Sequence, residues 1–408
     1  MARTRLSAPA LAVALGLGVI APAAALDPVD HQSPVERQGS VERQSSDGRP
    51  GGVATAPSGL ATGEFARSGV TRTTLAPGVD YTTWTQTDAR GPVRLYLLSV
   101  DYRRRSVTLD VRNPGTVSSV ATVLDTATAA GAIAAVNGDF YDIGRTGAPL
   151  GVTRSRTGGV LQGRVSGWNS AFSFDRDGRP QLSTITLKAA IAGHPALQVT
   201  NLNSHFVAPD GIGIYTPRWG ATPGYQVTRG QRTHVRRVVV RDGRVVTNGS
   251  QLKPGRPLEG LELIARGDAA DRLRTALPVG SRFSASWHLS GRPRMAITGS
   301  RFLVYRGVVQ ARDDRDLEPR TLLGIDRDTH RLLLLVADGR TDASRGFTMV
   351  ESAQEMIDLG ADAALNLDGG GSSTMVAALP GQALAVQNVP SDGFERRVGD
   401  SLVVLSSK

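Results

Sequence analysis

The sequence predicts an α+β fold in which two main helices pack on a large, mostly antiparallel sheet, within a single domain. Apolar residues alternate with polar ones in many short segments, as at Val107, Leu109 and Val111, which is the period of a half-buried strand. Turn-forming pairs such as Asp177-Gly178 and Asp242-Gly243 separate apolar runs, as they do in antiparallel hairpins. Only two segments have strong helical spacing.

Residues 1–25 have the order of a secretory signal peptide: a charged start, an apolar run over residues 8–19, and small residues up to Ala25. We therefore expect cleavage near Ala25 and a secreted, extracellular protein. The alternative is a permanent membrane anchor, against which Pro9 and the small residues before Ala25 argue. No later stretch approaches the roughly 20 apolar residues of a spanning helix, so no stable membrane span is expected after cleavage.

Residues 26–68 are predicted to form a disordered spacer. They are rich in Ser, Gly, Pro, Gln and Arg, and they repeat the letters VERQ at 35–38 and 41–44. Such a composition offers too little apolar surface to offset the entropy that ordering costs. The folded domain is therefore placed at residues 69–408.

The first predicted helix begins after Ser118 or Ser119, either of which would cap its free amides. Apolar residues recur at helical spacing between residues 120 and 127. Gly131 ends the helix, since glycine readily adopts the conformation that follows a last helical turn.

The second predicted helix begins with a capping box from Thr348 to Glu351, in which each side chain satisfies a free backbone amide, and ends at Gly360. Each predicted helix is followed by a short apolar strand and then by a polar turn that contains glycine. The first such turn begins at Asn137 and the second at Asn366. Two similar units therefore present polar residues directly after a buried strand.

The composition excludes several classes of function. There is no cysteine, so neither a thiol nucleophile nor a thiolate metal site is available. The net charge of +10 comes almost entirely from scattered arginines, and aromatic residues are only 5%, so no nucleic-acid partner is expected. The charge instead favours acidic, phosphate-bearing material. The histidines also lack the spacing of a helical zinc site, and no serine lies in a Gly-x-Ser-x-Gly elbow.

The stretch LNLDGGGSSTM carries the strongest chemical signal in the chain. Asn366 and Asp368 are two positions apart, so on an extended segment they point to the same face. The glycines at 369–371 allow a ligand to approach the backbone, and their amides can form a nest for an anion. Ser372 and Ser373 add hydroxyl groups beyond this nest. The alternative is a tight turn in which Asp368 only bonds its own backbone.

Two further groups of polar residues follow predicted strands. Asn137 and Asp139 lie in the first polar turn, where loops on a rigid scaffold often carry function. Arg320 begins an apolar strand, and a downstream strand ends at Asp338 and Arg340. Arginine can hold a phosphate through two parallel hydrogen bonds. The alternatives are an ordinary polar turn and solvated surface arginines.

These blocks resemble the phosphodiester glycosidase family. The resemblance runs in order from about residue 71 to 405, and it implies hydrolysis of a sugar-1-phosphodiester with the polar motif residues at one site. It does not imply which carboxylate has which role. The blocks that carry it best are AAVNGDFYD (134–142), RTLLGID (320–326), VADGR (336–340), GFTMVESAQEMIDLGADAALNLDGGGSSTM (346–375) and RVGDSL (397–402).

A phosphate monoester is a good leaving group, so such an enzyme needs charge stabilisation more than a strong general acid. We expect Arg320 and the amides of residues 369–371 to bind the phosphate, with Arg340 as a second clamp. Asp368 is the first choice for the carboxylate that faces the anomeric carbon or activates water. Asp139 is the second choice.

Asn137 and Asn366 would orient sugar hydroxyls, and Asp338 would either take part in catalysis or hold an arginine. No cofactor is expected to be required. The predicted partner is a phosphate-linked carbohydrate, such as N-acetylglucosamine-1-phospho linkages in cell-surface glycopolymers. The candidate catalytic residues are Asp368, Asp139 and Asp338, and the candidate substrate-binding residues are Asn137, Arg320, Arg340, Asn366, Gly369, Gly370, Gly371, Ser372 and Ser373.

Two other functions stay open at the level of sequence. One is a metal-dependent phosphodiesterase in which Asp139, Asp142, Asp338 and Asp368 bind calcium or magnesium and water attacks phosphorus. The other is a non-catalytic protein that binds a wall polymer, with the glycine loop holding phosphate. Widely spread tryptophans argue against the binding protein, because such sites usually offer aromatic platforms.

Overall fold

The computed structural model describes residues 66–407 of the chain. The predicted signal peptide and the predicted spacer as far as residue 65 lie outside the described residues. Within residues 66–407, no helix has the length and hydrophobicity that a transmembrane helix requires.

The described residues form a mostly β structure, so the prediction of an α+β fold with one large sheet and two main helices is wrong. Twenty-five strands form four sheets, and the same residues contain three α-helices. The predictions of individual strands are confirmed at three places. The strand around Val107–Val111 forms, and so do the hairpins at Asp177-Gly178 and Asp242-Gly243. Short amphipathic strands, however, do not encode which distant strand they pair with.

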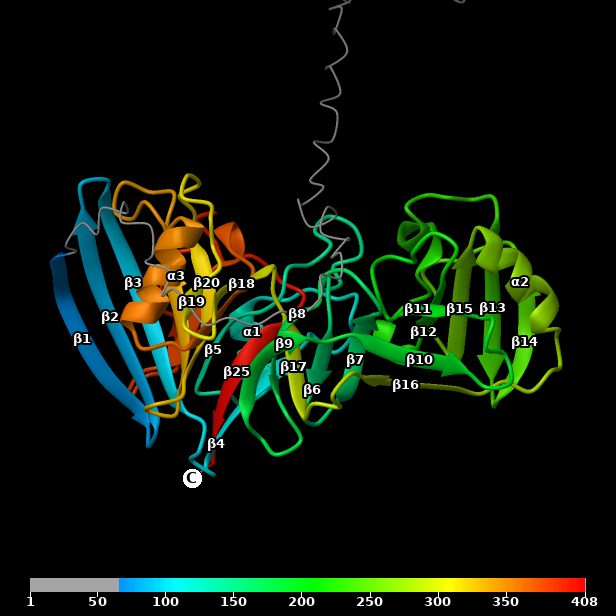
Figure 1. Cartoon of the computed structure of the whole chain (residues 1–408), viewed down its shortest axis with the longest axis horizontal. Coiled ribbons are helices and arrows are strands. Elements are labelled where there is room, and N and C mark those ends of the chain that lie inside the picture. Colours follow the sequence, from blue (N-terminus) through cyan, green and yellow to red (C-terminus); the bar gives the residue numbers. More distant parts are fainter. Residues whose placement is uncertain (1–65, 408) are drawn as a thin grey trace, which may run out of the picture. The chain divides into compact units, whose positions relative to one another are not determined.

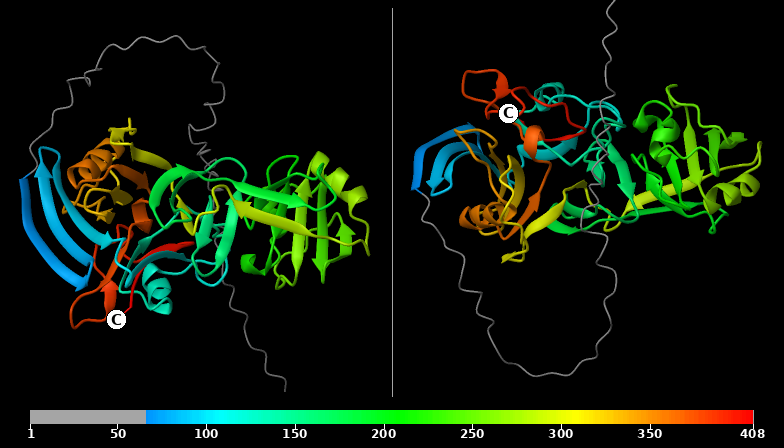
Figure 2. Two further views of the ribbon diagram at one scale, coloured as in Figure 1. Left: turned by 60° about the horizontal axis from the view of Figure 1, so that its bottom comes forward. Right: turned by 90° about the horizontal axis from the view of Figure 1, so that it is seen from above.

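The eight-stranded sheet is antiparallel and carries helix α3 (Met349–Asp358) on one face (Figures 1 and 2). The predicted capping box of this helix is present, since Thr348 and Glu351 each bond the other's backbone amide. In spatial order the strands are β1 (Ala66–Ala76), β2 (Val79–Asp88), β3 (Gly91–Asp101), β21 (Arg331–Ala337), β20 (Arg320–Asp326), β22 (Ala363–Asn366), β18 (Arg301–Tyr305) and β19 (Val308–Val309).

The five-stranded sheet packs against helix α1 (Val123–Ala129). Thr122 caps this helix through its hydroxyl, rather than Ser118 or Ser119, so the predicted start was about one turn too early. In spatial order the strands are β24 (Leu384–Val386), β23 (Met375–Ala378), β5 (Ala134–Asn137), β25 (Ser401–Ser406) and β4 (Val107–Arg112).

The ten-stranded sheet contains one parallel pair, and a two-stranded sheet contributes to the same hydrophobic core. Helix α2 (Asp268–Ala276) also packs in this core and was missed, because its buried residues are mostly alanines. The ten strands are β14 (Arg244–Gly249), β13 (Val235–Arg241), β15 (Leu261–Arg266), β12 (Ile212–Tyr215), β11 (Val199–Leu202), β7 (Gly159–Arg164), β6 (Thr153–Ser155), β17 (Met295–Thr298), β8 (Ser170–Phe174) and β9 (Pro180–Thr184), and the other two are β10 (Leu187–Ile191) and β16 (Ala285–Leu289).

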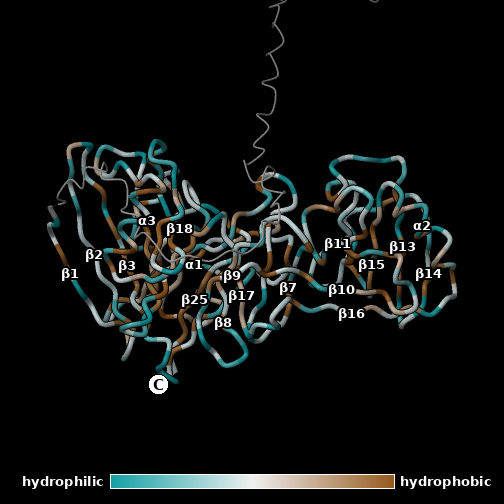
Figure 3. The backbone as a smooth tube through the Cα atoms, viewed as in Figure 1, coloured by the Kyte–Doolittle hydropathy of each residue, from teal (hydrophilic) through white to brown (hydrophobic). Residues whose placement is uncertain are grey.

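One hydrophobic core joins three of these sheets. Leu98 and Leu334 contribute from the eight-stranded sheet, Val136 and Leu402 from the five-stranded sheet, and Phe172 from β8. Figure 3 shows the hydrophobic residues concentrated on the strands and the hydrophilic ones in the connecting loops. The shared core fixes the ends of β5 and β22, and these ends carry the two polar turns.

Candidate active site

The two polar turns meet through backbone and side-chain hydrogen bonds. The Asp368 amide donates to the Gly138 carbonyl at 3.0 Å, and the Asn137 side-chain amide donates to the Asp368 carbonyl at 2.7 Å. The Asn137 side-chain oxygen accepts from the Thr321 hydroxyl at 2.7 Å and from the Thr374 amide at 3.1 Å. Asn137 is fully buried, so its side chain holds the two turns together.

Asp368 is buried, although less completely than Asp139, with 9% of the residue surface exposed against 0% for Asp139. Burial raises the pKa of Asp368 to about 7, while the nearby Ser372 hydroxyl, Arg396 and the Gly369 amide favour its anion. The Ser372 oxygen lies close to this carboxylate but makes no hydrogen bond of standard geometry within residues 66–407. A carboxylate with a pKa near neutrality is suited to proton transfer.

Arg396 and Asp392 form an ion pair beside the glycine turn, with 2.6 Å between the arginine Nη2 and the aspartate Oδ2. Gly371 permits this approach, because a Cβ at that position would lie 2.1 Å from the Arg396 guanidinium. Tyr141 completes the surroundings of Asp368, and burial and the Asp368 charge raise the pKa of its phenol. The phenol donates to the Arg397 carbonyl at 2.8 Å.

The glycine turn is a short 3-10 helix, η4 (Gly370–Ser372), and its backbone amides are partly used. The Gly370 amide donates to the Pro319 carbonyl at 2.8 Å. The Arg340 guanidinium lies over Gly370, where a Cβ would be 3.1 Å from its Nη2, and it pairs with Glu318 at 2.6 Å. Arg340 is therefore placed at the glycine turn, with its charge partly neutralised.

Arg320 begins β20 beside Gly369, but its guanidinium points to main-chain carbonyls. Its Nε donates to Phe347 at 2.9 Å and its Nη2 to Asp316 at 2.8 Å. The side chain is largely buried, which lowers the pKa of Arg320. In this structure Arg320 anchors the chain around Phe347 and is not turned toward Asp368.

Asp139 lies in an enclosed cluster at the first turn, and the charge of Asp368 acts on its neighbour Asp400 by raising the pKa of that group. Its carboxylate accepts from the Trp168 indole at 2.9 Å, the Thr298 hydroxyl at 2.6 Å and the Gly151 amide at 3.0 Å. Its backbone amide donates to Asp400 at 2.8 Å. Burial is the larger cause that raises the pKa of Asp139, and the negative charge of Asp400 raises it further. Ionisation of one of these two carboxyl groups therefore disfavours ionisation of the other.

Asp338 forms hydrogen bonds with the loop that follows the glycine turn. It accepts from the Tyr96 phenol at 3.0 Å, from the Asn388 side chain at 3.0 Å and from the Val389 amide at 3.1 Å. Asn388 also donates to the Ser373 carbonyl at 3.0 Å. Asp338 therefore fixes the loop after the glycine turn instead of facing Asp368.

The remaining candidates lie at the edges of this arrangement. The Asn366 side chain donates to Ser300 at 2.8 Å, and its oxygen has no hydrogen-bond partner within the described part of the chain. Ser373 is buried, and its hydroxyl is likewise without a partner among these residues. The Ser372 hydroxyl affects the pKa of Asp368, whereas the Asn366 and Ser373 side chains do not.

Residues from the segment 392–400 were not chosen from the sequence, although three of them surround the site. Arg396 and Asp392 flank Gly371, and Asp400 contacts Asp139. The closing RVGDSL block contains Asp400 and could have pointed to it, whereas Asp392 and Arg396 lie before that block. Among residues 66–407 no group of three or more His, Asp or Glu residues is arranged as metal ligands.

The comparison with known proteins gives a match over the C-terminal part of the chain. Residues 220–405 match the family of phosphodiester glycosidases, which confirms the resemblance over that range. No curated protein matches the chain.

Solved structures from Synechocystis and Burkholderia pseudomallei share the fold at low sequence identity. A hypothetical protein from Synechocystis has a TM-score of 0.67 and 20% identity, with 83% of this chain covered, and this chain spans 64% of that protein. A Burkholderia pseudomallei protein described as exported has a TM-score of 0.68 and 20% identity, over 86% of this chain and 98% of that one. The catalytic domain of zebrafish N-acetylglucosamine-1-phosphodiester alpha-N-acetylglucosaminidase has a TM-score of 0.45 and 17% identity, over 83% and 88%.

Proposed function

From the match of residues 220–405 to phosphodiester glycosidases, we propose that this protein hydrolyses the bond between a sugar's anomeric carbon and a phosphodiester. The observation that carries the proposal is the Asp368 carboxylate, which lies with Arg396, Tyr141 and Ser372 at a glycine turn. This arrangement combines a proton acceptor with a cation and backbone amides. These are the groups that hydrolysis with a phosphate leaving group requires.

In the proposed reaction Asp368 acts as the general base. Water attacks the anomeric carbon, and Asp368 takes a proton from that water. The bond between the anomeric carbon and the phosphodiester oxygen breaks. The phosphate monoester leaves with the electron pair of that bond. A pKa of about 7 leaves a fraction of Asp368 ionised at neutral pH, as a general base requires.

Arg396 and Arg340 are the proposed cations for the departing phosphate. Both guanidiniums lie against the glycine turn, and both side chains keep an exposed part. Each is paired with a carboxylate, Asp392 or Glu318, which a substrate phosphate would replace. Arg320 has a supporting role in this proposal, because its guanidinium already donates to two main-chain carbonyls.

Asp139, Asn137 and Asp338 are proposed to position the site. Each has its hydrogen-bonding groups directed to protein partners, and Asn137 and Asp139 are fully enclosed. A sugar hydroxyl would have to displace those partners to reach them. We therefore expect these residues to contribute to activity by fixing the conformation of the two turns.

The proposed substrate is a phosphate-linked carbohydrate of a cell-surface polymer, and the protein is proposed to be secreted. The signal-like order of residues 1–25 and the net charge of +10 support both. A related structure from Burkholderia pseudomallei belongs to a protein described as exported.

Hydrolysis of a panel of sugar-1-phosphodiesters in ¹⁸O-labelled water tests the reaction. Label in the released sugar supports attack at carbon, whereas label in the phosphate supports the metal-dependent phosphodiesterase. Asp368→Asn should lower turnover at least about 100-fold. Asp328→Asn, which changes an exposed aspartate, is the matched control and should keep full activity. Binding without any cleavage across the panel would leave a carbohydrate-binding protein instead of an enzyme.

A further inference from the structure

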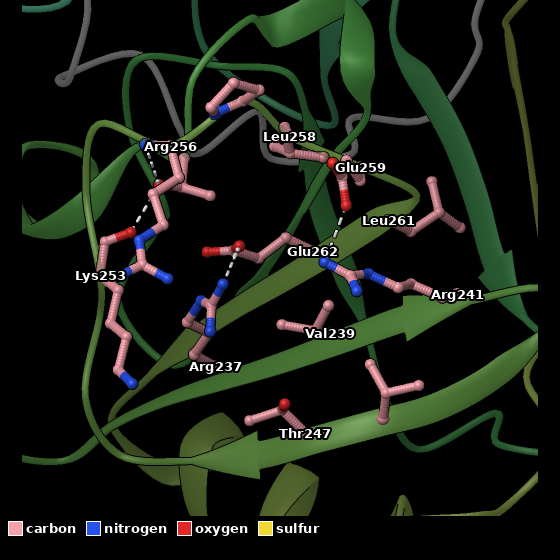
Figure 4. A pocket seen from close by; sticks show the side chains of 13 residues that line it. Arg237, Val239, Arg241, Thr247, Lys253, Arg256, Leu258, Glu259, Leu261 and Glu262 are labelled. Carbon is pink, nitrogen blue, oxygen red and sulfur yellow. Dashed lines mark hydrogen bonds and ion pairs between the residues drawn. The ribbon is translucent and has the colours of Figure 1, made fainter.

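A polar pocket lies on one face of the ten-stranded sheet, over β13, β14 and β15 (Figure 4). Side chains alternate along β13, so Val238 and Val240 enter the hydrophobic core, while Arg237 and Val239 face the pocket. Glu262 lies opposite Val239 in the register and therefore shares that face. The pocket has a volume of about 390 Å³, within the range of sites for small molecules.

The floor of the pocket contains a buried ion pair with unused hydrogen-bonding capacity. Arg237 donates to Glu262 Oε2 at 2.8 Å, and only 2% of the Glu262 side chain is exposed. The other carboxylate oxygen, Oε1, and the Arg237 Nε have no hydrogen-bond partner within residues 66–407. Buried charged groups usually have all such atoms satisfied, so these two atoms indicate a missing partner.

The side of the pocket carries cations on a fixed backbone. Lys253 and Arg256 are exposed, and neither side chain has an ion-pair or hydrogen-bond partner in the described part of the chain. Their loop is anchored, since the Thr222 amide donates to the Arg256 carbonyl at 2.7 Å and Leu258 donates to Gly220 at 3.0 Å. The backbone that presents the two cations is therefore already in place.

We propose that this pocket binds the phosphate ester of a sugar or polyol, with Lys253 and Arg256 on the phosphate and Glu262 on a hydroxyl. Cations alone would suit any anion. The buried carboxylate selects for a ligand that also donates a hydrogen bond, because it repels a bare anion. The proposal is independent of the proposed reaction, since it uses none of the residues around Asp368.

Calorimetric titration of the full chain with glycerol 3-phosphate, inorganic phosphate and glycerol tests the proposal. Glycerol 3-phosphate should bind more tightly than inorganic phosphate, and glycerol alone should not bind. The double variant Lys253→Ala/Arg256→Ala should weaken glycerol 3-phosphate at least about tenfold. The control Lys188→Ala/Arg272→Ala removes the same two residue types from exposed positions and should not change the affinity.

The variant Glu262→Gln tests the role of the carboxylate in the same titrations. It removes the repulsion of the carboxylate, so inorganic phosphate should bind more tightly and the preference for glycerol 3-phosphate should fall. Thermal unfolding would check that each variant remains folded. Unchanged glycerol 3-phosphate affinity in the Lys253/Arg256 variant would overturn the anion site, and an unchanged preference in Glu262→Gln would overturn the role of the carboxylate. Equal loss in the control variant would show that only net charge matters, which also overturns the site.

Discussion

The side chain of Asn137 donates a hydrogen bond to the carbonyl of Asp368 across 231 residues of sequence. Asn137 belongs to the five-stranded sheet and Asp368 follows a strand of the eight-stranded sheet. This side chain, together with the bond from the Asp368 amide to the Gly138 carbonyl, therefore holds the two polar turns together.

Asn137→Ala should lower both stability and activity. The change leaves the Asp368 carbonyl, the Thr321 hydroxyl and the Thr374 amide without their partner, and we expect a cost of about 2–4 kcal/mol in the free energy of unfolding. Denaturant unfolding measures it. Asn113→Ala is the control, since that side chain makes no hydrogen bond among residues 66–407. An equal effect in both variants would contradict the linking role of Asn137.

Asp368→Asn should flatten the dependence of stability on pH. Burial raises the pKa of Asp368 from 3.8 to about 7. Between these values the folded protein retains a proton that the unfolded chain has released, so stability falls as pH rises from about 4 through about 7. Asparagine does not titrate, and the variant should gain stability relative to the wild type at pH 8 compared with pH 5. Unfolding at both pH values measures this, and a constant difference would count against the raised pKa.

The activity should rise with pH to a plateau above about 7. The proposed base must be ionised, so kcat/KM should follow the deprotonation of Asp368. Arg396→Ala should lower kcat and move the midpoint to higher pH, because Arg396 favours the Asp368 anion. Arg312→Ala, at an exposed position, should leave the profile unchanged. A midpoint that stays in place in Arg396→Ala would separate that arginine from the base.

Gly371→Ala should reduce activity at least about tenfold with a smaller effect on folding. The new methyl group would meet both Arg396 and Asp392 and force the ion pair away from the glycine turn. Gly249→Ala is the control, since a Cβ there meets nothing within 4 Å. Steady-state kinetics together with thermal unfolding distinguishes the two effects. Full activity in Gly371→Ala would show that the position of Arg396 is unimportant.

The sequence predicted local structure better than architecture. The capping box at Thr348 and the short strands before Asn137 and Asn366 formed as expected, because hydrogen bonding and side-chain period act over a few residues. The division into four sheets was missed, because pairing joins distant strands such as β3 and β21. Helix α2 was missed since alanines give little periodic signal.

Some residues of the candidate site could be predicted from the sequence, and others could not. Gly369 and Ser372 do lie near Asp368, and Arg340 lies against Gly370; all of them come from motifs with an unusual composition. Arg396 gave no such signal, since it is one of many arginines and reaches Gly371 only through the fold. Conversely, Arg320 had a suitable residue type, but the main-chain carbonyls that hold it could not be inferred from spacing.

The place of β25 between β4 and β5 has a consequence for folding kinetics. The strand that carries Asn137 pairs with residues 401–404, and the amide of Asp139 bonds Asp400, 261 residues away. Closing such long loops is slow, because their entropy is lost before the contacts form. Assembly of the two turns should therefore be a late event, and a chain still emerging from the ribosome would lack the candidate site until nearly all of residues 66–406 are available.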